Sequence, residues 1–236
     1  MDLSGRNFII TGGAGGLGSA VTKEFLDAGA GVAVTYVVKE QWDELQAEIS
    51  GASGRLISRH LDATDHADLQ KAMATIHGQL GEVHGLVHLV GGFSYATVEA
   101  TEPGILERML SLNFRSTFLT CRAVIPLLRQ AGSGKILCVS ARAALKGTAG
   151  LSAYSASKAA VITLVQAMDD ELRDENIQVN CVLPSIIDTP ANREAMPDAD
   201  PSRWVQPEQI ARVLRFLASS DADVISGAAI PVYGRA

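Results

Sequence analysis

Seven short apolar runs, separated for the most part by longer segments of helical pattern, most constrain how this chain can fold. Strands that are apolar on both faces and joined by helices indicate a parallel sheet covered by helices on both sides. The sequence therefore predicts an α/β fold, with one doubly wound (Rossmann-type) domain over residues 1–236 and ligands bound beyond the carboxyl ends of its strands. The sheet should have about seven parallel strands, at residues 7–11, 31–36, 55–60, 85–90, 135–140, 178–183 and 228–232.

Composition narrows the class of function. A chain of 236 residues with 47% hydrophobic residues can bury one sizeable core. Its net charge of -6 and its lack of a Lys/Arg run argue against nucleic acid as a partner. No apolar run approaches the roughly 20 residues that span a bilayer, and the first residues do not resemble a signal peptide. We expect a cytoplasmic protein without a nucleic-acid or membrane partner, which leaves a small-molecule substrate as the partner to be tested against the motifs.

The cysteines and histidines do not form a metal-ligand pattern. Cys121, Cys138 and Cys181 are widely spaced among apolar neighbours, which is typical of buried thiols in a reducing compartment. His84 and His88 flank or enter a predicted strand, where a separation of four residues spans about 13 Å. We therefore predict no metal site.

A glycine-rich loop, residues 11–18, follows the first predicted strand and opens a helix that should run to about Ala28. Glycines allow a tight turn and close approach to a pyrophosphate, whose charge the amides at a helix start stabilise. The alternative is a glycine-rich turn that only packs.

The end of the second strand does not decide between NAD and NADP. A carboxylate there would bind the ribose 2′-hydroxyl of NAD, whereas a cation would favour the 2′-phosphate of NADP. This chain has Tyr36 at that position, and Lys39 follows three residues later. The sequence therefore leaves both NAD and NADP as candidate cofactors.

Tyr154 and Lys158 are four residues apart in a segment of helical pattern, residues 154–173, so they lie on the same helix face. A nearby ammonium favours the phenolate form of a tyrosine, and we expect it to lower the pKa of Tyr154 towards the working range. The apolar spacing in this helix predicts a core face of Ala156, Ala160, Leu164, Met168 and Leu172.

In combination, Thr11-Gly12-x3-Gly16-x-Gly18, Asp62, Asn113 and Tyr154-x3-Lys158 resemble the short-chain dehydrogenase/reductase family over nearly the whole chain. The segment 184–189 is similar to that family's Pro-Gly-x-[Ile/Val]-x-Thr motif, with serine in place of glycine. The resemblance implies an NAD(P)-dependent oxidoreductase that forms a homodimer or homotetramer.

The resemblance also implies roles for individual residues. Tyr154 would exchange the proton that accompanies hydride transfer, Lys158 would bind the nicotinamide ribose, and Asn113 would hold a water that connects Lys158 to solvent. Two residues of the family pattern have structural alternatives. Asp62 could cap the helix that follows it, and Asn113 could bend the helix that contains it by bonding to the backbone. The resemblance implies that the pyrophosphate side of the dinucleotide is held by Gly12, Gly16, Leu17 and Gly18. Other implied cofactor contacts are Asp62 and Ala63 at the adenine, Ile187 and Thr189 at the carboxamide, and Val90, Gly91 and Pro184.

Two departures from the family pattern stand out. The family's Asn-Asn-Ala-Gly segment is replaced by residues 88–91, His-Leu-Val-Gly, so a polar residue that helps to pin the sheet is expected to be missing. The family's substrate-orienting serine stands thirteen residues before the tyrosine, where this chain has Ala141, and Ser140 lies one residue too early. A slip of one residue on a strand turns a side chain to the opposite face unless a bulge restores it.

A narrower resemblance concerns segments 90–93, 140–148 and 188–200, which are similar to those of quinonoid dihydropteridine reductase. That branch keeps the tyrosine and lysine without the serine, because its substrate takes hydride into a conjugated ring. Against this, the branch has an acid where Tyr36 stands, and Asn113 follows the wider family.

The segment 187–205 has no clean periodicity and is long for a connection, so we expect a loop that closes over the substrate. Candidate contacts there are Arg193, Met196 and Trp204, the last being equally suited to a packing role. Three functions remain open: a reductase that is possibly similar to dihydropteridine reductase, a ketoreductase of 3-oxoacyl or small carbonyl substrates that uses Ser140, and a catalytically silent dinucleotide-binding sensor or scaffold.

Overall fold

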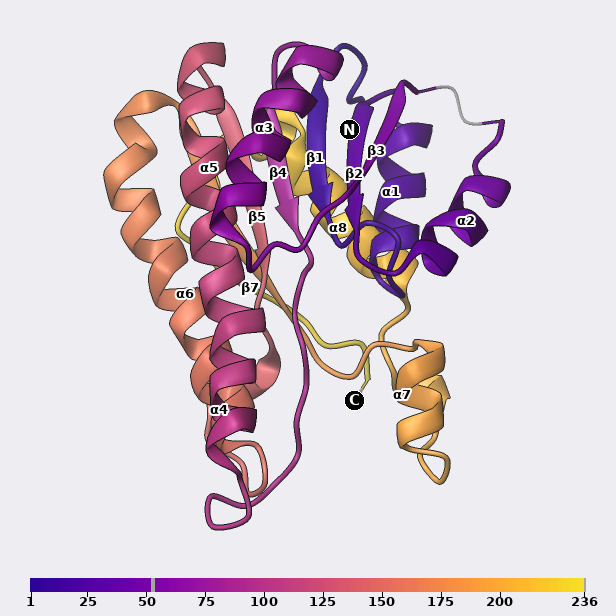
Figure 1. The fold of residues 1–236 in the computed structure, drawn as a ribbon, viewed down its shortest axis with the longest axis vertical. Coiled ribbons are helices and arrows are strands. Elements are labelled where there is room, and N and C mark those ends of the chain that lie inside the picture. Colours follow the sequence, from indigo (N-terminus) through magenta and orange to yellow (C-terminus); the bar gives the residue numbers. More distant parts are fainter. Residues whose placement is uncertain (52–53, 236) are drawn as a thin grey trace.

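A computed structural model describes residues 1–51 and 54–235 and confirms the predicted doubly wound fold. Seven strands form one sheet in the order β3-β2-β1-β4-β5-β6-β7, with every neighbouring pair parallel (Figure 1). The direction of winding changes between β1 and β4, where Ile9 lies opposite Ala33 on one side and Leu86 on the other. The strands are β1 (Asn7–Thr11), β2 (Gly31–Tyr36), β3 (Leu56–His60), β4 (Gly85–His88), β5 (Gly134–Val139), β6 (Ile177–Pro184) and β7 (Ala229–Val232).

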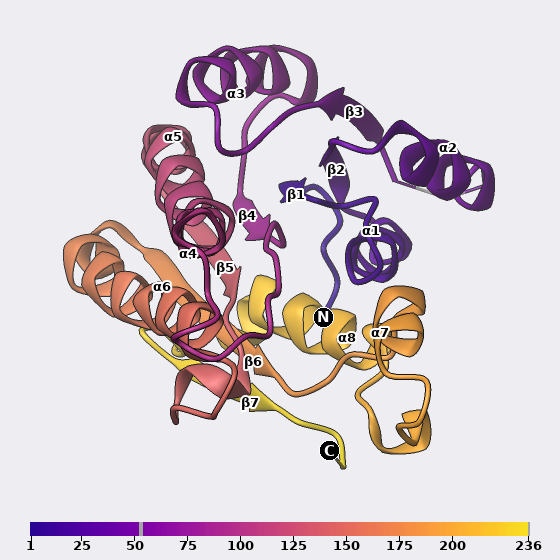
Figure 2. The same ribbon diagram turned by 60° about the horizontal axis from the view of Figure 1, so that its bottom comes forward.

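Helices cover both faces of the sheet. Figure 2 shows α3, α5 and α6 on one face and α1, α2 and α8 on the other. The described helices are α1 (Gly18–Asp27), α2 (Lys39–Glu48), α3 (His66–Leu80), α4 (Pro103–Met109), α5 (Ser116–Ala131), α6 (Ser152–Leu172), α7 (Pro190–Ala195) and α8 (Pro207–Ala218), with a π-helical turn, η1 (Leu110–Arg115), between α4 and α5.

Alternate residues of the strands point into two apolar cores, one on each face of the sheet. On β1, Phe8 belongs to the core under α1 and α8, while Ile9 belongs to the core under α3, α5 and α6. The Phe8 ring meets the Phe25 ring of α1 edge-on, with centroids 5.1 Å apart. Burial on both faces explains why the strands read as continuous apolar runs.

The predicted core face of α6 is wrong in its first half. Val161 and Val165 are buried there, while Ala156 is exposed. Ser157 and Lys158 also face the interior, so the buried stripe contains polar residues that an apolar pattern does not detect. Met168 and Leu172 are buried as predicted, and Leu164 is partly buried and packs against the same core.

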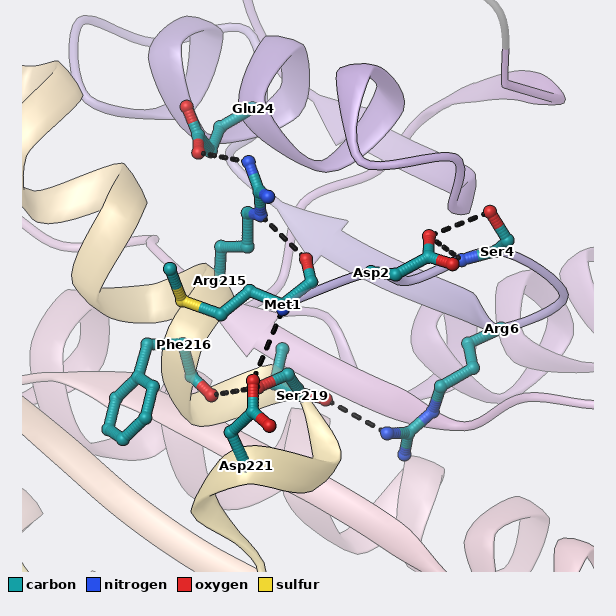
Figure 3. A network of polar contacts seen from close by, with 10 residues as sticks. Met1, Asp2, Ser4, Arg6, Glu24, Arg215, Phe216, Ser219 and Asp221 are labelled. Atoms are coloured by element: carbon teal, nitrogen blue, oxygen red, sulfur yellow. Dashed lines mark hydrogen bonds and ion pairs between the residues drawn. The ribbon is translucent and has the colours of Figure 1, made fainter.

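The first residues of the chain are tied to α8 by polar contacts (Figure 3). The amino group of Met1 lies 3.2 Å from Asp221, and the Arg215 guanidinium donates to the Met1 carbonyl and to Glu24 of α1. Arg6 donates to the last carbonyl of α8 at 3.0 Å. This network joins three elements at the end of the sheet opposite the strands' carboxyl ends.

Cys121, Cys138 and Cys181 are buried and free, as the sequence predicted. Within the described residues no helix is long and apolar enough to cross a membrane, and no three acidic, histidine or cysteine side chains gather as metal ligands.

Candidate active site

The glycine loop depends on its glycines for steric reasons. Gly12 has φ +69°, in the left-handed region. A Cβ added to Gly18 would lie 2.1 Å from the Gly12 carbonyl oxygen, so no side chain fits there. No side chain caps the start of α1. The loop therefore presents a bare backbone and helix amides to an anion, which fits a dinucleotide pyrophosphate.

Three of the other predicted cofactor residues lie close to the glycine loop or to Lys158. A Cβ added to Gly16 would lie 3.1 Å from the Thr189 methyl group, and one added to Gly12 would lie 3.4 Å from Val90. Gly91 lies against Lys158, because a Cβ there would be 2.9 Å from the ammonium nitrogen. Segments far apart in the sequence thus meet at the carboxyl edge of the sheet.

Asn113 fixes the backbone that follows β4. Its side chain is fully buried, accepts from the Gly92 amide at 2.9 Å, and donates to the Gly92 carbonyl at 3.1 Å and to Ser157 at 2.9 Å. The residue lies within η1, a π-helical turn of the kind often found at functional sites. The sequence did not predict this clamp on Gly92.

Tyr154 and Lys158 occupy the first two turns of α6, and the structure contradicts the predicted pKa of the phenol. Burial raises the pKa of Tyr154 to about 12 instead of lowering it. Lys158 is buried as well, which lowers the pKa of its ammonium to about 8. That ammonium donates to the Val139 carbonyl at 2.9 Å. Burial is the cause of the raised pKa at Tyr154 and the largest cause of the lowered pKa at Lys158, so the tyrosine is a neutral phenol at pH 7.

Ser140 is buried, and its hydroxyl donates to the main-chain carbonyl of Lys158 at 2.7 Å. The hydroxyl therefore ties the end of β5 to α6. Ala141, at the family's usual serine position, is also buried and begins a short 3₁₀ turn, Arg142–Ala144.

His88 supplies the polar link that was expected to be missing. Its Nδ1 lies 2.8 Å from the Thr11 hydroxyl of β1, and its Nε2 lies 3.2 Å from the Ser116 hydroxyl of α5. Complete burial lowers the pKa of His88 to about 3, so the imidazole is neutral. A histidine that bridges two hydroxyls thus pins the centre of the sheet.

At the end of β2, Tyr36 stacks on Trp42 with ring centroids 5.5 Å apart and meets His60 edge-on. Lys39 is exposed and its ammonium lies 2.5 Å from Asp43 one turn later. These contacts leave the choice between NAD and NADP open.

Asp62 does not cap the following helix, so that alternative is wrong. Its Oδ1 accepts from the Thr64 amide at 2.8 Å and from the Thr64 hydroxyl at 2.7 Å. The cap of α3 is Asp65, which accepts from the amides of the first turn. Asp62 is exposed and the neighbouring Ala63 is buried.

The segment 187–205 contains the short helix α7 and returns to the sheet, where Ile187 pairs with Val205. Asp188 anchors it: this buried carboxylate binds Arg193 through two contacts of 2.6 and 2.8 Å and accepts from Gln206 at 2.9 Å. The Arg193 side chain is therefore held by Asp188. Trp204 is 5% exposed, which favours its packing role; Met196 is half-buried and Pro184 ends β6.

One aromatic contact at the site was not predicted. The Phe93 ring meets the Tyr154 ring edge-on, with centroids 5.0 Å apart and planes at 69°. The only sequence signal was a large apolar residue directly after Gly91-Gly92, in a segment where polar residues would be expected on the surface.

The fold and this site define a dinucleotide-dependent oxidoreductase, and comparison with known proteins agrees. A model of the short-chain dehydrogenase family matches residues 6–200. The chain is 30% identical to 3-oxoacyl-[acyl-carrier-protein] reductase FabG of Thermotoga maritima, over 99% of this chain and 98% of that protein. It is 32% identical to cyclopentanol dehydrogenase of Comamonas sp., with 96% and 94% covered. The chain therefore belongs to the short-chain dehydrogenase/reductase family of oxidoreductases, whose cofactor is NAD or NADP.

Solved structures show the same fold. A short-chain dehydrogenase/reductase from Serratia marcescens superposes with a TM-score of 0.92 at 28% identity, covering 100% of this chain and 99% of that one. A structure of ElxO with NADP bound has a TM-score of 0.91 at 23% identity, with 97% of each chain covered, which shows the shared fold alone.

Proposed function

We propose that this protein is an NAD(P)H-dependent reductase in which Tyr154 donates the proton that accompanies hydride transfer. The observation that carries the proposal is the placement of Tyr154 on the first turn of α6, one turn before Lys158, whose ammonium lies against Gly91 and the Val139 carbonyl at the carboxyl edge of the sheet. Partial burial raises the pKa of the phenol to about 12, so it is protonated at neutral pH. A protonated acid is the form that reduction requires. The Lys158 ammonium, mostly charged at pH 7 with a pKa of about 8, would stabilise negative charge that develops on the phenolate.

Residues of the chain fit the cofactor, which supplies the hydride when bound. The glycine loop would hold the pyrophosphate, because it has no side chain to cover the helix amides: a Cβ at Gly18 would clash with the Gly12 carbonyl oxygen, and one at Gly16 would press on Thr189. Asp62 and Ala63 would contact the adenine, and Ile187, Thr189 and Pro184 would contact the nicotinamide end. Lys158 would bind the nicotinamide ribose, and Asn113 would support proton supply from solvent. Tyr36 and Lys39 lie where the cofactor is selected.

The proposed substrate is an acceptor that needs no serine donor. The Ser140 hydroxyl is engaged with the Lys158 carbonyl, and Ala141 offers no hydrogen bond. A conjugated ring that delocalises incoming charge, like a quinonoid dihydropterin, depends less on such a donor than an isolated ketone does. The similar segments 140–148 and 188–200 support this substrate class.

The second candidate is a carbonyl reductase or alcohol dehydrogenase, favoured by the relatives, which include a 3-oxoacyl reductase and a cyclopentanol dehydrogenase. Ser140 would have to rotate away from α6 to serve it. As in much of the family, the active form of either enzyme would be a homodimer or homotetramer.

The two candidates separate in one experiment. Wild type, Ser140→Ala and Ala141→Ser are assayed for NADH and NADPH oxidation with a quinonoid dihydropterin and a panel of ketones. The proposal expects turnover of the conjugated acceptor, less than about threefold change in kcat for Ser140→Ala, and new ketone activity in Ala141→Ser. A loss of about 100-fold or more with ketones in Ser140→Ala would favour the carbonyl reductase, since one such donor contributes on that order. Cofactor binding without turnover of any acceptor would favour the silent sensor.

A further inference from the structure

Phe93 combines two properties that rarely occur together. Its side chain is 64% exposed, yet its ring packs edge-on against Tyr154, the proposed proton donor. Leaving a large apolar side chain in water forgoes the free energy that its burial would provide. A ligand that covers the outer face of Phe93 would recover that free energy directly beside the proposed proton donor.

The backbone on the N-terminal side of Phe93 is fixed. Asn113 holds both the amide and the carbonyl of Gly92. A Cβ at Gly92 would lie 2.9 Å from Leu112, so the chain passes close to η1 at this point. The position of Phe93 over α6 is therefore set by buried hydrogen bonds.

The backbone on the C-terminal side is fixed as well. The Ala96 amide donates to the Gly150 carbonyl at 2.8 Å, and Ala96 forms a bridge with Leu151 just before α6. The Tyr95 ring covers Gly150 so closely that a Cβ there would lie 2.5 Å from the ring. Phe93 thus projects from a segment anchored at both ends, which limits the conformational entropy lost when a ligand binds.

The surroundings of Phe93 favour an uncharged partner. Tyr95, Val98 and Leu145, on the two segments that flank the start of α6, are 72%, 77% and 58% exposed. Between Gly91 and Glu107 the sequence contains no Lys or Arg. On the segment that carries Leu145, Arg142 lies over the Tyr233 ring and Lys146 is exposed, so the cations near Phe93 lie outside the segment that holds it. Aromatic rings prefer offset-stacked or edge-to-face partners.

From these observations we infer that Phe93 is the specificity-determining platform on which a flat, uncharged, conjugated acceptor stacks with its reacting end at Tyr154. The inference rests on the proposed reductase function and names the substrate class of the same site. The acceptor gains two electrons as one hydride from the reduced nicotinamide, and one proton from Tyr154, which is reprotonated from solvent. A quinone thereby becomes a hydroquinone while NAD(P)H is oxidised to NAD(P)⁺.

The kinetic test compares Phe93→Ala, Phe93→Tyr and a control, Phe118→Ala, which removes an exposed ring from α5. Each is assayed with menadione, a flat quinone, and with cyclohexanone, a non-aromatic ketone. We expect Phe93→Ala to raise the KM for menadione about tenfold, a typical size for loss of one stacked ring, with kcat within twofold. Phe93→Tyr should restore the wild-type KM, and Phe118→Ala should leave it unchanged. An equal effect on both acceptors, or a fall in kcat at constant KM, would show that Phe93 only positions Tyr154 and would overturn the inference.

A binding test separates failure of the platform from failure of the reductase proposal. Dissociation constants for menadione are measured by protein fluorescence with NADP⁺ present and, in parallel, with NAD⁺ present, using wild type and Phe93→Ala. About tenfold weaker binding in Phe93→Ala supports the platform even if no acceptor is turned over, in which case only the reductase proposal fails. Equal binding to the two proteins, or none to wild type, overturns the platform even if turnover is seen with other acceptors.

Discussion

The two halves of the active site follow different rules. On the cofactor side, β1, the glycine loop and α1 match the family pattern, and backbone geometry fixes them: Gly18 touches the Gly12 carbonyl, which excludes any side chain. On the substrate side, the arrangement depends on side chains. Ala141 stands where the family has a serine, Phe93 is exposed and contacts Tyr154, and Asp188 binds Arg193 of α7. In the proposed function, the cofactor half would supply the binding chemistry of the family, and the substrate half would set which acceptor is reduced.

The variant with the largest expected effect is Gly18→Ala, which tests whether backbone geometry sets cofactor binding. The added methyl group would meet backbone atoms at 2.1 to 2.8 Å, and these cannot move without deforming the loop. We expect NAD(P)H affinity to fall about 100-fold or more and the free energy of unfolding to fall by about 1–3 kcal/mol. Calorimetric titration and urea unfolding measure the two effects.

Gly78→Ala is the matched control for Gly18→Ala. It lies in α3, where an added Cβ meets nothing within 4 Å. That variant should gain about 0.5–1 kcal/mol in stability and keep its cofactor affinity. If Gly18→Ala binds NAD(P)H as wild type does, the steric account of the cofactor half is wrong.

Asn113→Ala tests the hydrogen bonds by which Asn113 holds Gly92 next to α6. It leaves the Gly92 amide and carbonyl without their partner, and we expect a loss of about 2–4 kcal/mol in the free energy of unfolding. Asn113→Asp keeps the acceptor for the Gly92 amide but places a buried carboxylate oxygen against the Gly92 carbonyl, so it should also be destabilised relative to wild type. Equal stability of wild type and Asn113→Ala in urea unfolding would contradict the proposed clamp.

The pH dependence of stability tests whether His88 is held as a neutral imidazole between the Thr11 and Ser116 hydroxyls. The folded pKa of about 3 lies below the ordinary value of 6.5, so the unfolded chain binds a proton that the folded chain does not between these values. The contribution of His88 is therefore fully present above about pH 6.5 and is lost as the pH falls towards 3. The loss should approach roughly 1.4 kcal/mol per pH unit within that window.

His88→Asn keeps a polar group at the pin and does not titrate. From pH 7 to pH 5, the free energy of unfolding should fall more for wild type than for this variant, as measured by urea titrations. Parallel pH profiles would show that the imidazole is not held neutral.

The smallest effect concerns cofactor choice. Lys39 is exposed and paired with Asp43, so its contribution to a 2′-phosphate contact is weakened by solvent and by its partner. Lys39→Ala should weaken NADPH binding about threefold and leave NADH unchanged, while Asp43→Ala should strengthen NADPH binding by a similar factor. Equal changes for both cofactors would show that Lys39 does not meet the 2′-phosphate.

The sequence predicted the backbone better than the side chains. Every strand was located to within about two residues, because burial on both faces leaves a continuous apolar run. The α6 face was misassigned because Ser157 and Lys158 occupy its buried stripe, which the apolar pattern cannot reveal. The pKa of Tyr154 was wrong in direction because spacing gives proximity along a helix but not burial. The Phe93 contact and the His88 bridge join distant segments, so local sequence does not predict the partners of these two side chains.

The central claim, that a protonated Tyr154 gives the proton in reduction, is tested most directly by Tyr154→Phe. The change removes one hydroxyl and keeps the ring against Phe93. The account predicts that kcat with the conjugated acceptor falls about 100-fold or more while the Kd for NAD(P)H stays within twofold, since general acid catalysis typically contributes a factor of roughly 10²–10⁴. Undiminished turnover in Tyr154→Phe would contradict it.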